Sequence, residues 1–197
     1  ASIFTEAQPE ASAYIGTYFY DGFDCPLLAQ VAEEMHEKMP WVLRGHHLRG
    51  AWAYKYQHNS TGIQLHADEA AVNLNTWLTP TSSLLDVDGG DHETVPGIDD
   101  GGLVVYTRLA PLSWTFSEYN SATAHGTILE FLAQDEPPFQ NVTVRYRQNR
   151  MVLFDSNLIH RTGKLHFKRG YKNRRINLTF LFGHRHRGRG GVRIGAA

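Results

Sequence analysis

From Gly50 to Phe182 the chain is a series of short segments rich in tyrosine, tryptophan, valine, threonine and phenylalanine, separated by clusters of glycine, asparagine, aspartate and proline. Such segments are typical of β-strands, and the clusters between them are typical of turns. The expected strands are AWAYKYQ from Ala51, GIQLHAD from Gly62, AVNLNTWL from Ala71, GLVVYTRL from Gly102, NVTVRYR from Asn141, RMVLFDS from Arg150 and RINLTFLF from Arg175. Many short strands with a few helices predict an antiparallel barrel of two sheets, the jelly-roll type.

Two segments carry helical spacing and are expected to flank this mainly β fold. The first runs from Asp24 to Met39, with Asp24 as a cap, Pro26 in the first turn and apolar residues at roughly helical intervals. The second runs from Thr115 to Gln134, although Gly126 weakens a helix there. The first of them would pack an apolar face on the core.

Length and charge limit the number of domains and the kinds of partner. The chain has 197 residues, and we expect one domain over residues 1–183 and a basic, glycine-rich, flexible tail over residues 184–197. With 19 basic and 20 acidic residues the net charge is -1, so neither nucleic acid nor an anionic membrane is expected as a partner. The single cysteine, Cys25, excludes an internal disulfide framework and fits a reducing, cytoplasmic compartment.

His66 and Asp68 are separated by one residue within an expected strand. In a strand, residues i and i+2 face the same side about 6.5 Å apart, so both side chains could approach one small cation. A neutral imidazole and a carboxylate are suitable ligands for a divalent iron. A lone pair of this kind can equally form a local hydrogen bond, so a metal site needs a third ligand from elsewhere.

Candidates for the remaining groups lie near the C-terminus. His160 follows the apolar strand that ends at Asp155, with His166 as the rival third ligand. In RINLTFLF, alternation places Arg175, Asn177 and Thr179 on one face and Ile176, Leu178 and Phe180 on the other. An arginine on a polar inner face is suited to binding a carboxylate through two parallel hydrogen bonds. A shift of one residue would put Arg174 in its place, and Arg169 is a more distant rival.

Three motifs together, HAD at residues 66–68, His160 after VLFDSNLI, and RRINLTF, resemble the iron(II)- and 2-oxoglutarate-dependent dioxygenase superfamily. The resemblance covers roughly residues 54–182 and implies a double-stranded β-helix, the cupin-like form of the jelly roll. It implies that His66, Asp68 and His160 hold iron(II) and that Arg175 binds the far carboxylate of 2-oxoglutarate. The RxNLTF run is similar to that of the nucleic-acid demethylase branch, which adds Asn177 as a cosubstrate contact, but Leu181 stands where that branch carries a further arginine.

Further pocket residues follow from alternation on neighbouring strands. Tyr54 and Tyr56 share one face of an expected strand, and Asn73 and Asn75 share one face of the next, so all four are candidates to contact 2-oxoglutarate. The resemblance implies a hydroxylase that consumes O2 and 2-oxoglutarate and releases succinate. A small molecule or a peptide is expected as the substrate. A cupin-like metal enzyme or binding module without 2-oxoglutarate is the alternative, and a nucleic-acid demethylase of the same chemistry is another.

Overall fold

A computed structural model describes residues 6–7, 14–85, 101–121, 123–134 and 140–185. The α-helices are α1 (Pro26–Lys38), α2 (Pro40–Leu43), α3 (Phe116–Tyr119) and α4 (Ala124–Leu132), and the 3-10 helices are η1 (Phe19–Asp21), η2 (Thr81–Ser83) and η3 (Tyr171–Asn173). The strands are β1 (Glu6–Ala7), β2 (Tyr14–Tyr18), β3 (Leu48–Tyr56), β4 (Asn59–Ser60), β5 (Val72–Trp77), β6 (Leu103–Leu109), β7 (Asn141–Val144), β8 (Met151–Asp155), β9 (Leu158–Thr162), β10 (Leu165–His166) and β11 (Ile176–Phe182).

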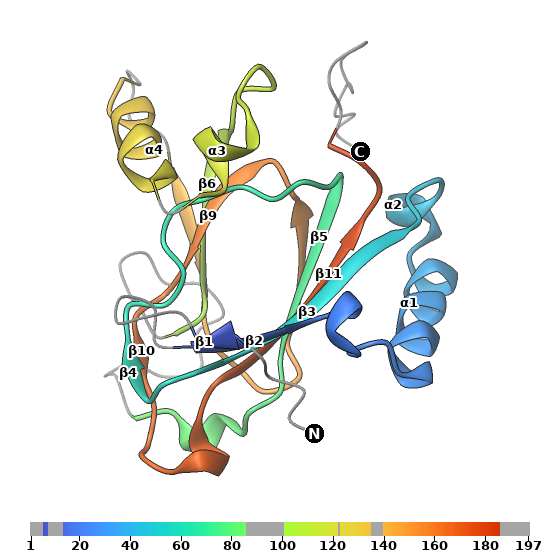
Figure 1. The fold of residues 1–197 in the computed structure, drawn as a ribbon, viewed down its shortest axis with the longest axis vertical. Coiled ribbons are helices and arrows are strands. Elements are labelled where there is room, and N and C mark those ends of the chain that lie inside the picture. Colours follow the sequence, from blue (N-terminus) through green and yellow to red (C-terminus); the bar gives the residue numbers. More distant parts are fainter. Residues whose placement is uncertain (1–5, 8–13, 86–100, 122, 135–139, 186–197) are drawn as a thin grey trace.

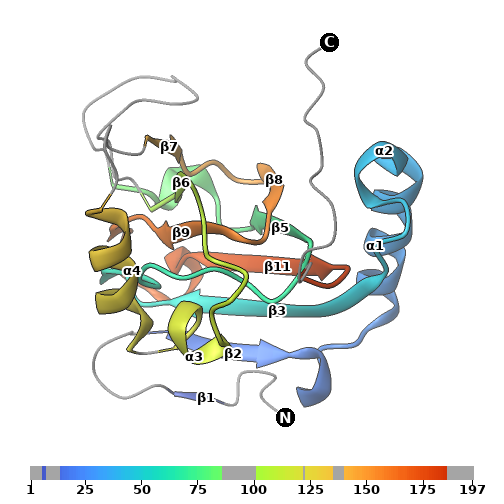
Figure 2. The ribbon, with the colours of Figure 1, turned by 90° about the horizontal axis from the view of Figure 1, so that it is seen from above.

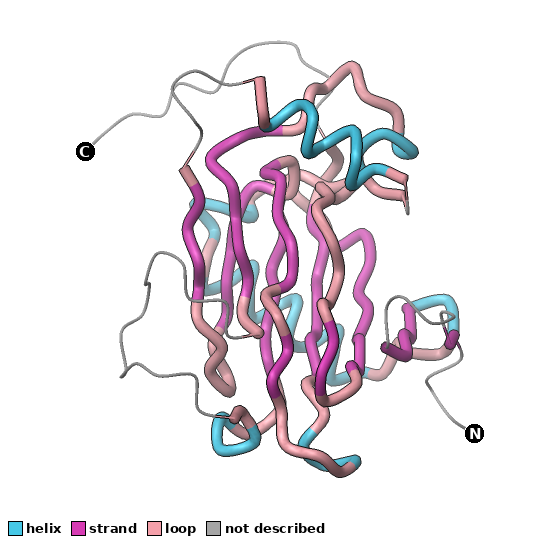
Figure 3. Tube along the Cα trace, turned by 90° about the vertical axis from the view of Figure 1, so that its left-hand side faces the viewer, coloured by secondary structure: helices cyan, strands magenta, loops and turns pink. Residues whose placement is uncertain are grey.

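These strands form two antiparallel sheets that face each other (Figure 1; Figure 3). The larger sheet has the order β1-β2-β3-β11-β5-β8, and the smaller has the order β7-β6-β9, with β10 and β4 forming a separate pair. Strands distant in sequence are therefore neighbours, as β3 and β11 are. The predicted mainly β fold of two antiparallel sheets with flanking helices is confirmed.

The two faces of the larger sheet differ in chemistry. On β11, Leu178, Phe180 and Phe182 belong to an apolar cluster that includes Leu28 and Ala32 of α1, which covers the outer face of this sheet (Figure 2). Asn177 and Thr179 point the other way, toward the smaller sheet, and hydrogen-bond to Asn75 of β5. The alternation expected for this strand is thus confirmed, and the inner face of the barrel is polar at its centre.

Replacing Phe180 with alanine should lower the free energy of unfolding by about 3–5 kcal/mol, because the ring is buried against α1 and its loss leaves a cavity. Urea unfolding of the purified protein measures this change. Leu27→Ala is the matched control, because Leu27 lies on the exposed side of α1, and it should change stability by no more than about 0.5 kcal/mol. Equal losses for the two variants would contradict the assigned packing of α1.

The segment GIQLHAD is not the strand that the sequence predicts. Only His66 is paired, in an isolated antiparallel bridge with His160. The next two backbone N–H groups turn to other partners: Ala67 donates to the Tyr119 carbonyl and Asp68 to the Ser156 carbonyl. Because successive residues bond to three different segments, no ladder can form.

Other boundaries also differ from expectation. Cys25, not Asp24, is the N-cap of α1, because Pro26 occupies the first helical position. The expected helix over residues 115–134 is two helices, since Asn120 ends α3 and α4 begins only at Ala124. Strand β2 has no counterpart among the expected strands. No helix in the described part of the chain is long and apolar enough to span a membrane.

Candidate metal centre

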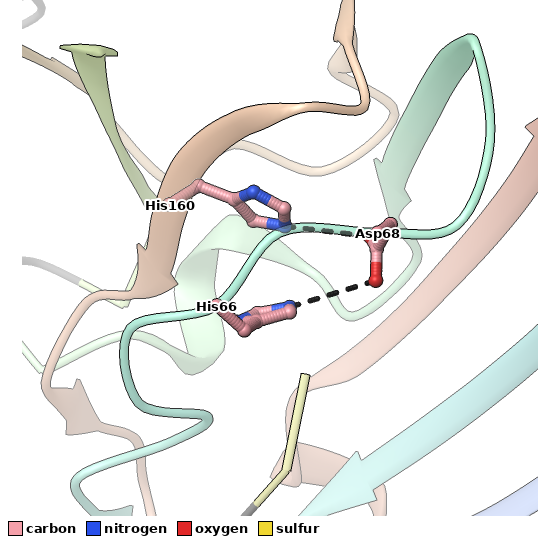
Figure 4. A group of neighbouring side chains, drawn as sticks. All are labelled: His66, Asp68 and His160. Atoms are coloured by element: carbon pink, nitrogen blue, oxygen red, sulfur yellow. Dashed lines mark ion pairs between the residues drawn. The ribbon is translucent and has the colours of Figure 1, made fainter. Parts of the chain in front are cut away.

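His66 and His160 lie side by side because their backbones form a reciprocal pair. The His66 N–H donates to the His160 carbonyl at 3.0 Å, and the His160 N–H donates to the His66 carbonyl at 2.8 Å. Residues paired in this way project their side chains to the same side, and the two ring centroids are 4.2 Å apart. Figure 4 shows both rings pointing to the space beside Asp68.

Asp68 completes the group from the turn that leads into β5. Its Oδ2 lies 3.4 Å from His160 Nε2, and its Oδ1 lies 3.9 Å from His66 Nε2 (Figure 4). One potential ligand atom from each of the three residues lies within 4.8 Å of the others. The structure thus brings together the three residues that the sequence predicts as metal ligands. His66 and Asp68 come from a loop, and His160 comes from β9.

Backbone carbonyls select which nitrogen of each histidine can bind a metal. His66 Nδ1 is 2.7 Å from the Gln64 carbonyl, and His160 Nδ1 is 2.8 Å from the Leu158 carbonyl. A carbonyl oxygen only accepts, so each Nδ1 carries the hydrogen and each Nε2 presents its lone pair toward Asp68. These two carbonyls fix both imidazoles in the tautomer and orientation that a metal ligand needs.

The protonation states suit a cation as well. Burial, and after it the neighbouring His160, lower the pKa of His66 to about 4, so this imidazole is neutral at pH 7. Burial alone would raise the pKa of Asp68, but the neighbouring His160 and His66 and the hydrogen bond from Asn120 hold that pKa below its ordinary value. Two imidazole nitrogens and one carboxylate therefore face one another, and this donor set fits a divalent transition metal.

The metal-free protein should lose stability in acid through His66. Its pKa is about 6.5 in the unfolded chain and about 4 in the folded protein, so between these values the unfolded state binds the extra proton. The free energy of unfolding is therefore unaffected by His66 above pH 6.5 and is lowered by roughly 3 kcal/mol at pH 4. Urea unfolding in the presence of a chelator measures the free energy of unfolding at pH 7 and at pH 4. The decrease between the two pH values should be larger for wild type than for His66→Gln by about this amount. Equal decreases would contradict the pKa of His66.

Two amides hold the carboxylate of Asp68. Asn73 Nδ2 of β5 donates to Oδ2 at 2.5 Å, and Asn120 Nδ2, at the end of α3, donates to Oδ1 at 3.0 Å and to the Ala67 carbonyl at 2.6 Å. Sequence reasoning missed Asn120, because its contact is formed across 52 residues. The only local signal is the capping box of Thr115 and Glu118, which starts the helix that Asn120 ends.

Arg175 is buried on the inner side of the larger sheet, immediately before β11. Its side chain is 1% exposed, Nε donates to the Gly101 carbonyl at 2.7 Å, and the guanidinium carbon lies 4.9 Å from the ring centre of Tyr56. The rings of Trp77 and Tyr146 lie 5.7 and 5.9 Å from it. Aromatic faces on several sides keep this cation in an environment where a bound anion would be strongly attracted.

The other predicted cosubstrate residues lie on the same inner face. Burial raises the pKa of Tyr56, an effect partly offset by the charge of Arg175. Tyr54 shares a 2.8 Å hydroxyl contact with Tyr18, and burial raises its pKa far above the ordinary value. Both hydroxyls are therefore neutral. Asn75 and Asn177 are joined by a 2.8 Å hydrogen bond across β5 and β11.

Two of the rival candidates, His166 and Arg169, lie at another place on the molecule. His166, in β10, lines a surface pocket of about 370 Å³ together with His58, Asn59, Leu85, Phe167, Lys168 and Arg169, none of which belongs to the triad. The backbone carbonyl of Arg174 accepts a hydrogen bond from Thr79. Arg185, at the start of the predicted tail, is buried and donates to the Asn157 side chain at 2.6 Å and to the carbonyls of Ala110 and Pro111. Residues 86–100 and residues 186–197, which hold the rest of the predicted tail, lie outside the described residues.

No protein-family model matches the chain, and no curated protein sequence matches it significantly. Solved structures do match. The non-heme alpha ketoglutarate dependent carbocyclase SnoK from nogalamycin biosynthesis is similar with a TM-score of 0.58 and 10% identity, over 91% of this chain and 68% of that one. The epimerase SnoN, of the same cofactor class and pathway, is similar with a TM-score of 0.51 and 10% identity, over 89% and 65%. HygX from Streptomyces hygroscopicus, with nickel and 2-oxoglutarate bound, has a TM-score of 0.48 and 13% identity, over 92% and 74%.

The similarities to SnoK and SnoN establish the fold. The chain has the double-stranded β-helix architecture shared by non-heme 2-oxoglutarate-dependent enzymes such as SnoK and SnoN, as the sequence predicted. Within that fold, its His-Asp-His cluster fits a metal site. The similarity to the nucleic-acid demethylase branch stays a prediction.

Proposed function

We propose that this protein is an iron(II)- and 2-oxoglutarate-dependent oxygenase that hydroxylates a C–H bond of its substrate. The observation that carries the proposal is the triad itself, in which backbone carbonyls fix both histidines with Nε2 toward one buried carboxylate. A buried arginine on the inner side of the same barrel supports the second half of the proposal, the cosubstrate.

In this proposal His66, Asp68 and His160 hold the iron. Three protein ligands would leave the rest of the metal's coordination sphere open to 2-oxoglutarate and O2. The bound iron would supply the coupling of 2-oxoglutarate decarboxylation, which yields succinate and CO2, to oxidation of the substrate. The protein supplies binding, orientation and exclusion of water.

Arg175 is the residue we assign to the far carboxylate of 2-oxoglutarate. A guanidinium stays charged when desolvated and matches a carboxylate with two parallel hydrogen bonds. Tyr56, beside it, and Asn177, next on the same face of β11, are assigned to the same cosubstrate, as is Tyr54. Their neutral hydroxyl and amide groups can hydrogen-bond to a carboxylate without adding repulsion.

Turnover of 2-oxoglutarate in the absence of a prime substrate tests the proposal. Protein supplied with iron(II), O2 and 2-oxoglutarate should form succinate slowly, as followed by NMR, and replacement of iron(II) by zinc should stop it. Iron binding without any consumption or binding of 2-oxoglutarate would instead favour the cupin-like alternative.

The kind of product formed from the substrate needs a separate test. SnoK is a carbocyclase and SnoN an epimerase, so this fold supports more than one result of C–H oxidation. We propose a small molecule or a peptide as substrate. Mass spectrometry of candidate substrates after turnover separates the results, because hydroxylation adds the mass of one oxygen atom, cyclisation removes two hydrogens and epimerisation changes no mass.

A further inference from the structure

The metal-ligating role of Asp68 belongs to the proposed function, and the following inference rests on it. Both oxygens of this carboxylate accept hydrogen bonds from side-chain amides, Oδ2 from Asn73 and Oδ1 from Asn120. Asn73 is fully buried in β5. A primary amide has an oxygen and a nitrogen of similar shape, so it supports the carboxylate only if its NH2 group faces Asp68.

A row of hydrogen-bonded polar side chains determines which way the amide of Asn73 faces. Asn75 Nδ2 donates to Asn73 Oδ1 at 2.6 Å, which leaves the NH2 of Asn73 directed at Asp68. Asn75 is oriented in turn, because its Oδ1 accepts from Asn177 Nδ2 at 2.8 Å and from Thr179 Oγ1 at 3.0 Å. Every hydrogen bond in this row donates in the same direction, toward the carboxylate.

The row extends from the strand that carries the cosubstrate residues to the metal site. Asn177 and Thr179 lie on β11 beyond Arg175, and Asn75 lies opposite Thr179 on β5. Hydrogen bonds that share a direction polarise one another, and in a buried setting each one strengthens the next. The NH2 of Asn73 is therefore a stronger and better aimed donor than an isolated amide.

We propose that Asn73 is a positioning residue for the metal ligand Asp68, and that Asn75 sets the direction of its amide. Asn73 then holds Oδ2 while Asn120 holds Oδ1, so the carboxylate cannot rotate away from the two Nε2 atoms. This role differs from the direct cosubstrate contact that alternation along the strand predicted for both asparagines.

Binding of Co²⁺ alone, without 2-oxoglutarate, tests the role of Asn73. Leucine has the same branching at Cγ as asparagine and removes both polar atoms, so Asn73→Leu should weaken Co²⁺ binding by about 10- to 100-fold and alter the visible spectrum of the bound ion. Asn173→Ala is the control: this asparagine in η3 hydrogen-bonds to Arg169 and Ser83 and touches no member of the triad. It should leave the Co²⁺ affinity and spectrum unchanged.

The Asn75→Asp variant tests the direction of the row. The new carboxylate has the shape of asparagine and keeps its two donors, Asn177 and Thr179, but it offers no hydrogen to Asn73. The amide of Asn73 should then reverse and turn its oxygen toward Asp68, and Co²⁺ binding should weaken about tenfold. Simple attraction between an added negative charge and a cation predicts the opposite, tighter binding.

The outcomes are distinguishable. Failure of wild type to bind Co²⁺ would overturn the proposed function and the inference together. Co²⁺ binding by wild type with unchanged affinity in Asn73→Leu, or with equal or tighter binding in Asn75→Asp, would overturn the inference alone. Circular dichroism shows whether each variant is folded, and if Asn73→Leu does not fold, the shape-conserving Asn75→Asp variant decides.

Discussion

Replacing Asp68 with alanine should reduce iron(II) binding by more than about 100-fold, because loss of a ligand costs more than the 10- to 100-fold typical of its supporting residues. His66→Ala and His160→Ala should do the same, since each removes one of the three donors that face one another. All three variants should stay folded, because the apolar clusters of the barrel do not include these side chains. Equilibrium dialysis under anaerobic conditions measures the affinity, and circular dichroism reports the fold.

Glu69→Ala is the matched control for Asp68→Ala. Glu69 carries the same functional group in the next position of the chain but is exposed, so its removal should leave iron affinity unchanged. Full iron affinity in all three ligand variants would show that the metal site lies elsewhere, and an equal loss in Glu69→Ala would show that only the net charge matters.

Arg175→Ala should leave iron(II) binding intact and weaken 2-oxoglutarate binding by about 2–5 kcal/mol, that is, by at least about 30-fold. This is the range observed when one partner of a desolvated charge pair is removed. The guanidinium is enclosed by the rings of Tyr56, Trp77 and Tyr146, so water cannot readily replace it. Calorimetric titration of 2-oxoglutarate into the anaerobic iron-loaded protein gives the affinity.

Arg174→Ala serves as the control for position. Arg174 precedes Arg175 in the chain, and a shift of one residue would exchange their faces. It should keep 2-oxoglutarate affinity near that of wild type. Unchanged affinity in Arg175→Ala, or a larger loss in Arg174→Ala, would contradict the assignment of the anchor.

Some of the fold and the site could be read from the sequence because the signals are local. Alternation along RINLTFLF separates Arg175, Asn177 and Thr179 from the apolar side chains that pack on α1, and the structure has this arrangement. The chemistry of the HAD motif pointed to a metal, although its backbone is not a strand. Convergence of His66 and Asp68 depends instead on separate backbone bonds to His160, Tyr119 and Ser156.

Other features depend on partners that no local pattern reveals. Asn120 reaches Asp68 because α3 packs against the segment around Ala67, and the Gln64 and Leu158 carbonyls select the tautomers. For Asn73, alternation indicated the inner face, but the hydrogen-bonded row through Asn75 determines what the amide contacts there. Such choices between neighbouring polar groups are settled by tertiary structure.

The most direct test of the central claim is an anaerobic titration of the iron(II)-loaded protein with 2-oxoglutarate, followed by visible absorption. We expect a charge-transfer band from 2-oxoglutarate bound to the iron to grow to saturation in wild type and to be absent in His160→Ala. Iron that is bound in wild type but gives no band at saturating 2-oxoglutarate would contradict the claim that this barrel is a 2-oxoglutarate-dependent oxygenase.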